Sequence, residues 1–184
     1  MRPGLFLMIV MASIYEVAGI IHSIVSGFEE ECVKCLEANG EDIVGSIQEQ
    51  LYSGLDGNED SLRPGYSDDP YFQQTKGRWR NDPDGYIRWK EEKTPPAVSP
   101  KLNLSARPVD VPNLIITGAF HESIFTERKG DGIHIGTKGF DDGPLIVKKY
   151  GEQILSPGNT AKEYFNMEFL IPWLKRFFRD CGYK

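Results

Sequence analysis

A long segment without hydrophobic periodicity, residues 55–112, is the feature that most constrains the fold of this chain. Turn-forming runs recur along it, including Asp56-Gly57, Pro64-Gly65 and Asp82-Pro83-Asp84-Gly85. Gly, Pro and Asp favour the backbone conformations that turns require. Because a structureless loop of this length is uncommon inside a compact domain, we expect a long excursion with a short hairpin of its own. The alternating residues 86–90 predict a short strand within it.

A helical pattern precedes this excursion. Apolar residues at helical spacing predict a helix over residues 28–52. Ser26 is expected to cap its N-terminus, and Gly54 is expected to stop it. The pair Asn39-Gly40 predicts a break near its middle.

The first residues, 1–27, form an apolar arm. A helical stripe runs through it, which Gly19 and Gly27 are expected to weaken or break. The run 5–12 resembles the core of a signal peptide, although no small-x-small cleavage site follows at once. Glu16 interrupts the arm well before the ~20 apolar residues that a membrane span needs. If the arm is retained, it is an apolar helix that needs a partner, such as a neighbouring subunit.

Strand patterns follow the excursion. Short strands are predicted at residues 114–117, 123–128 and 132–137. Pro144 suits the first turn of a short helix that Gly151 stops.

A strongly aromatic helix ends the chain. Asn159 or Thr160 is expected to cap it, with Glu163 at capping-box spacing from Thr160. The helix is predicted to run to about Arg179 and to kink at Pro172. Its aromatic face consists of Phe165, Phe169, Trp173, Phe177 and Phe178.

The order of these elements predicts an α+β fold. It would combine a small antiparallel β-sheet or sandwich with a long N-terminal helix, a C-terminal aromatic helix and long loops. A chain of 184 residues is long enough for one domain with a buried core. We therefore expect an apolar N-terminal arm over residues 1–27 and a single α+β structural domain over residues 28–184, with the excursion at 55–112.

Charge argues against a general nucleic-acid binder, because the net charge is −6 and the pI is about 5.2. One local run nevertheless has the residue types that contact phosphates and stack on bases. The alternative, which the net negative charge of the chain favours, is that the Trp rings of this run pack in the fold and its Arg side chains pair with acidic residues. The run's candidate binding residues are Arg78, Trp79, Arg80, Arg88 and Trp89.

Catalytic and metal-binding patterns are weak. Cys32 and Cys35 lack the further ligands of a structural zinc site, and the acidic loop at residues 56–60 departs from a calcium loop at later positions. His121 lies near Ser123 without the context of a nucleophile elbow. The sequence predicts no catalytic site, no metal and no cofactor; a hydrolase that uses His121 or the paired acids is the least supported class.

Three short motifs carry a resemblance. They are Gln50-Leu51-Tyr52-x-Gly54, Asn113-Leu114-x-x-Thr117-Gly118-x-Phe120 and Lys149-Tyr150-Gly151. In this order, with helices at both ends, they resemble the tail-completion and head–tail connector proteins of tailed phages. The arm at residues 1–27 and the insert that carries Trp79 and Trp89 depart from that pattern.

The resemblance implies a structural virion protein rather than an enzyme. Copies of the chain would form a homo-oligomeric ring around the DNA channel of the phage neck, assembled in the host cytoplasm. Its partners would be the portal or adjacent connector and tail proteins, with a possible passing contact with phage DNA and no membrane. The structural residues implied are Leu51, Tyr52, Gly54, Thr117, Gly118, Phe120, Tyr150 and Gly151.

A second interpretation starts from the N-terminus. If residues 1 to about 18 are a signal peptide, the chain is a secreted or periplasmic small binding protein. The mass of the native protein distinguishes the two, because it shows whether the N-terminal arm survives.

Overall fold

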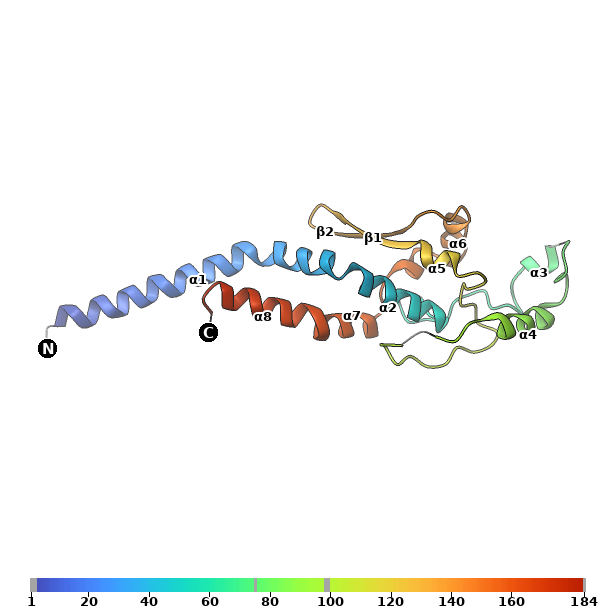
Figure 1. The fold of residues 1–184 in the computed structure, drawn as a ribbon, viewed down its shortest axis with the longest axis horizontal. Coiled ribbons are helices and arrows are strands. Elements are labelled where there is room, and N and C mark those ends of the chain that lie inside the picture. The colour runs from blue at the N-terminus through green and yellow to red at the C-terminus, as the bar shows by residue number, and fades with distance from the viewer. Residues whose placement is uncertain (1–2, 75, 98–99, 184) are drawn as a thin grey trace.

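The computed structural model describes the backbone of residues 3–74, 76–97 and 100–183, and the side chains of these segments from residue 13 onward. It is an α+β fold of elongated shape (Figure 1). The helices and strands are α1 (Pro3–Ala38), α2 (Gly40–Tyr52), α3 (Tyr71–Gln74), α4 (Pro83–Lys93), α5 (Ala119–Ser123), β1 (Ile124–Lys129), β2 (Gly132–Thr137), α6 (Gly143–Tyr150), a 3-10 helix (Glu152–Leu155), α7 (Asn159–Phe165), a π-helical turn (Asn166–Leu170) and α8 (Ile171–Asp180).

The long helix α1 runs out of the body of the molecule, while α3 and α4 lie at the opposite end (Figure 1). Gly19 and Gly27 do not break it, and the prediction of an N-cap at Ser26 is wrong: the Ser26 hydroxyl donates to the carbonyl of His22 inside the helix, at 2.7 Å. The contact with α8 explains Gly27, since a Cβ there would lie 3.0 Å from the Phe177 ring. Within the described segments, no helix combines the length and apolar character needed to cross a membrane.

The predicted break at Asn39-Gly40 is confirmed, because α1 ends at Ala38 and α2 begins at Gly40. Gly40 is required by close packing: a Cβ at this position would lie 2.3 Å from the hydroxyl oxygen of Thr126 on β1. The break lets α2 turn into the centre of the fold.

Helix α2 forms the middle of the core. Ile47 and Leu51 are fully buried, and they belong to one cluster with Ile124 of β1 and Phe165 of α7. Gln50 is also buried, and its side chain bridges to the segment before α7 through the Gly158 amide at 2.7 Å and the Ser156 carbonyl at 3.1 Å.

The sheet is the antiparallel hairpin of β1 and β2, paired from Ile124–Thr137 to Lys129–Gly132. The two predicted strands at 123–128 and 132–137 are thereby confirmed, whereas the sandwich is not seen in the described residues. The strand predicted at 114–117 is wrong, because Leu114 adopts a φ of 55°, outside the extended region.

The excursion is ordered by short helices rather than by a hairpin. The strand predicted at residues 86–90 is wrong: these residues belong to α4. Asp82 caps this helix by accepting a hydrogen bond from the Gly85 amide at 2.9 Å, and Pro83 occupies its first turn. The alternating pattern of residues 86–90 is short, and the helix-start signal Asp82-Pro83 outweighs it.

The C-terminal helix begins at Asn159, with Gly158 as its N-cap, so the cap predicted at Asn159 or Thr160 is wrong. The Thr160 amide instead donates to the Glu59 carboxylate at 2.6 Å. A π-helical turn directly precedes α8, whose second residue is Pro172. Helix α8 then lies along α1, and the Trp173 indole donates to Glu31.

Candidate functional site

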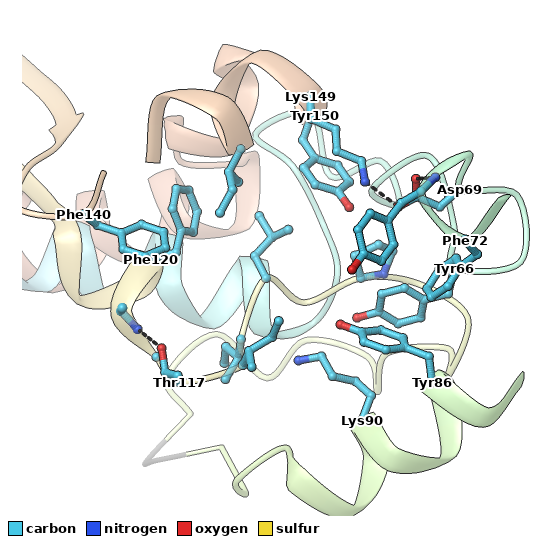
Figure 2. Close-up of a pocket in the computed structure, with 18 residues that line it drawn as sticks. Tyr66, Asp69, Phe72, Tyr86, Lys90, Thr117, Phe120, Phe140, Lys149 and Tyr150 are labelled. Atoms are coloured by element: carbon cyan, nitrogen blue, oxygen red, sulfur yellow. Dashed lines mark hydrogen bonds and ion pairs between the residues drawn. The ribbon is translucent and has the colours of Figure 1, made fainter. Parts of the chain in front are cut away.

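Two of the three motif regions, residues 113–120 and 149–151, meet at one pocket, whereas the motif at residues 50–54 does not line it. Its walls come from the turn around Tyr66, from α3 and α4, from residues 112–120 and from α6 (Figure 2). The cavity has a volume of about 250 Å³. Side chains of Tyr71 and Ile116 are exposed at its rim. The helices α3, α4 and α6, which contribute to its walls, lie at the end of the molecule away from the N-terminus of α1 (Figure 1).

Local hydrogen bonds shape the segment 112–120. The buried Asn113 side chain accepts from the Ile115 amide at 3.2 Å, which turns the chain at Leu114. The Thr117 hydroxyl accepts from the Ala119 amide at 3.3 Å. Gly118, with a φ of 92°, starts α5, and Phe120 enters the core. These residues therefore build a floor that is apolar except for its backbone groups and the Thr117 hydroxyl.

An aromatic cluster forms one wall. The Tyr66 and Tyr86 rings lie 5.1 Å apart edge to face, and the Phe72 ring lies 5.2 Å from Tyr86. Burial raises the pKa of the Tyr66, Tyr86 and Tyr150 hydroxyls. These phenols therefore remain protonated hydrogen-bond donors throughout the neutral range.

One ion pair lines the pocket, and a second lies near Lys90. Asp69, almost fully buried, pairs with Lys149 from α6 and also accepts from the Tyr71 amide at 3.0 Å (Figure 2). Glu91 pairs with Arg107. Both carboxylates near the site are thus already neutralised by a cation.

Lys90 has no such partner. Its side chain is 2% exposed and lines the pocket, and its Nζ makes no hydrogen bond within the described part of the chain. Burial, followed by the charge of Arg107, lowers its pKa to about 8. Figure 2 shows Lys90 extending from α4 beside Tyr86. An uncompensated buried amine of this kind is uncommon, since buried cations are normally paired.

His121 and Ser123 are not arranged as a catalytic pair. The His121 ring donates from Nε2 to the Asn113 carbonyl at 2.9 Å, and the Ser123 hydroxyl donates to the Phe120 carbonyl at 2.7 Å. Burial lowers the pKa of His121 to about 4. Among the residues with described side chains, no group of three or more His, Cys, Asp or Glu is placed to hold a metal ion.

The basic-aromatic run is brought together on and beside α4. The Trp79 and Trp89 rings lie 5.5 Å apart, and the Arg78 guanidinium lies 4.3 Å from the Trp79 ring centre. Arg78, Arg80 and Arg88 are exposed, and none of them forms an ion pair with a carboxylate in the described residues. The packing of the Trp rings matches the alternative given above for this run, whereas the expected pairing of its arginines with acids is not seen among the described residues.

Other predicted structural residues lie elsewhere. Leu51 is in the core, and the Tyr52 hydroxyl donates to the Pro95 carbonyl at 2.7 Å. Gly54 and Gly151 end α2 and α6 with φ values of 73° and 91°. Tyr150 lines the pocket beside Lys149.

Sequence reasoning missed Lys90 and Asp69 as site residues. The start signal Asp82-Pro83 could have revealed α4, and with it the shared helix face of Tyr86 and Lys90. No local pattern indicated that Lys90 would be left unpaired.

Comparison of the chain with protein-family models, with curated proteins and with solved structures finds no match in any of the three.

Proposed function

We propose that this protein is a structural assembly component whose copies associate through α1, and that the assembly is a ring in the neck of a tailed phage, at the head–tail connector or tail-completion position. The observation that carries the proposal is an apolar stripe on α1 that no other element of the described structure covers. The placement in a phage neck rests on the three sequence motifs.

The stripe consists of Ile14, Val17, Ile21 and Val25, whose side chains are 51–70% exposed. With about 3.6 residues per turn, these positions share one helix face. The neighbouring face of α1 is occupied by the C-terminal region, where Phe177 contacts Gly27. The helix therefore has one packed apolar face and one free apolar face.

A second copy of the chain fits this free face. Ile14, Val17 and Ile21 follow the three- and four-residue steps of the heptad repeat with which helices wind around one another. Full burial of each such side chain contributes roughly 1.5–3 kcal/mol. Copies that associate through identical α1 helices around an axis form a closed cyclic assembly, and the bodies of the subunits then surround that axis.

The test is native mass spectrometry of the purified protein, supported by class averages from electron microscopy. The variant Ile14→Glu with Ile21→Glu is expected to shift the oligomer to monomer, because it places charges within the apolar contact. Ser23→Glu, an exposed position off the stripe on the same helix, is the control and should keep the oligomer. A monomer at all concentrations with an intact N-terminus, both alone and with phage neck proteins, would contradict the proposal.

Contact with DNA is a separate part of the proposal. The exposed cations Arg78, Arg80 and Arg88 beside two Trp rings have the chemistry of a nucleic-acid contact. Reversal of all three charges should impair DNA packaging or retention, whereas Lys129→Glu at the exposed hairpin end should not. Normal packaging and retention in the triple variant would exclude this contact.

The second candidate is a secreted or periplasmic small binding protein, which the pocket around Lys90 favours. A native protein that lacks its first residues by intact mass, is monomeric and is absent from virus particles would support this function over the first.

A further inference from the structure

We infer that the pocket between α4, α6 and residues 112–120 is a binding site for a small carboxylate with an apolar body, whose carboxylate is held by Lys90. This site does not depend on the assembly function, because all of its walls come from one chain.

The charges around the pocket favour an anion. Asp69 is matched by Lys149 and Glu91 by Arg107, so the site holds one cation in excess. That cation is Lys90, which is nearly fully buried and unpartnered within the described residues. With a pKa of about 8, most of its amine is protonated at neutral pH. A bound carboxylate would supply the missing counter-charge through a charge-assisted hydrogen bond.

The remaining lining favours an apolar body for the ligand. Leu114, Ile115, Phe120 and Ile146 present aliphatic and aromatic surface to the cavity. Pockets of this composition, with few polar groups, hold ligands by burial of apolar surface and orient them through the polar groups.

The size of the cavity limits the ligand. A cavity of about 150 Å³ in another protein is known to accept benzene. At about 250 Å³, this pocket has room for a ring of that size together with a carboxylate. The protonated phenols of Tyr66 and Tyr86 are additional donors in the same cavity, which suits an acceptor-rich carboxylate better than a cation.

The experiment is isothermal titration calorimetry of the full-length protein with benzoate, and with benzyl alcohol as the neutral ligand of similar shape. Benzoate is expected to bind at least about tenfold more tightly than benzyl alcohol. Lys90→Met should remove this difference, because it keeps the length of the side chain and deletes the charge. Lys93→Met, an exposed position on the same helix, is the matched control and should bind benzoate as the unmodified protein does.

A second measurement uses the unmodified chain and so does not depend on the folding of a variant. Acetylation of lysines by acetic anhydride, followed by mass spectrometry, should show slower modification of Lys90 when benzoate is present, with Lys93 unaffected. Equal affinity for the charged and the neutral ligand, unchanged affinity in Lys90→Met, no binding of benzoate at about 10 mM, or no protection of Lys90 would each overturn the inference.

Discussion

Replacement of Lys90 by Met should stabilise the folded protein, although Lys90 is one of its most buried side chains. In the folded state the pKa of Lys90 falls from 10.5 to about 8, mainly because burial disfavours the charged amine. Each pKa unit corresponds to about 1.36 kcal/mol. The charged amine therefore destabilises the folded state by about 3 kcal/mol at pH 7, and Met removes this cost while filling similar space.

The pH dependence separates this mechanism from a simple change in packing. Below pH 8 the amine is charged in both the folded and the unfolded chain, so the full cost is present. As pH rises from 8 to 10.5, the folded state loses its proton first and the cost disappears. The advantage of Lys90→Met should thus be about 3 kcal/mol at pH 7 and clearly smaller at pH 9.5. The raised pKa values of Tyr66 and Tyr86 affect both proteins and leave the difference between them nearly unchanged.

The assay is urea unfolding of the unmodified protein, Lys90→Met and Lys93→Met at one protein concentration, at pH 7 and pH 9.5. An exposed lysine contributes little, so Lys93→Met should lie within about 0.5 kcal/mol of the unmodified protein. A loss of stability in Lys90→Met at pH 7, or a gain that does not change with pH, would refute the reasoning. The first result would mean that Lys90 has a structural partner; the second would assign the gain to packing alone.

Three further predictions concern stability. Burial lowers the pKa of His121 from 6.5 to about 4. The contribution of neutral His121 to the free energy of unfolding should therefore be fully present above pH 6.5 and should fall by up to about 3 kcal/mol as pH drops through 4. His121→Gln should weaken this pH dependence in unfolding titrations. Gln50→Leu leaves the Gly158 amide without its side-chain acceptor and should cost about 2–3 kcal/mol in urea unfolding. Gly54→Ala should destabilise by about 1–3 kcal/mol because of its φ of 73°, whereas Gly45→Ala, within α2 and with open space around it, should stabilise by about 0.5–1 kcal/mol; thermal unfolding of both variants compares the two signs.

Several elements of the fold could be predicted from short stretches of the sequence. The hairpin at residues 124–137 and the helix ends at Gly54 and Gly151 were predictable, because alternation and positive φ are properties of a few adjacent residues. The break at Asn39-Gly40 was also predictable, because two residues that favour helices poorly stand next to each other there.

The mistakes had two causes: a distant segment overrode local preference at Gly27, and the effect of a nearby side chain was overlooked at Leu114 and in residues 86–90. Gly27 was expected to weaken or break α1, yet Phe177 packs onto it and the helix continues. Leu114 was expected in a strand, yet the Asn113 side chain turns the chain there. Residues 86–90 alternate like a strand, yet the cap at Asp82 makes them helical.

The sequence by itself determined the α+β class, the apolar character of the N-terminal helix and the three motif segments. Only the tertiary structure decided that the motifs at residues 113–120 and 149–151 would line one cavity. It also decided that Asp69 and Glu91 would take Lys149 and Arg107 as partners, while Lys90 has none within the described residues. The physical reason is that helices, turns and apolar stripes depend on neighbouring residues, whereas burial and charge pairing depend on which distant segments meet.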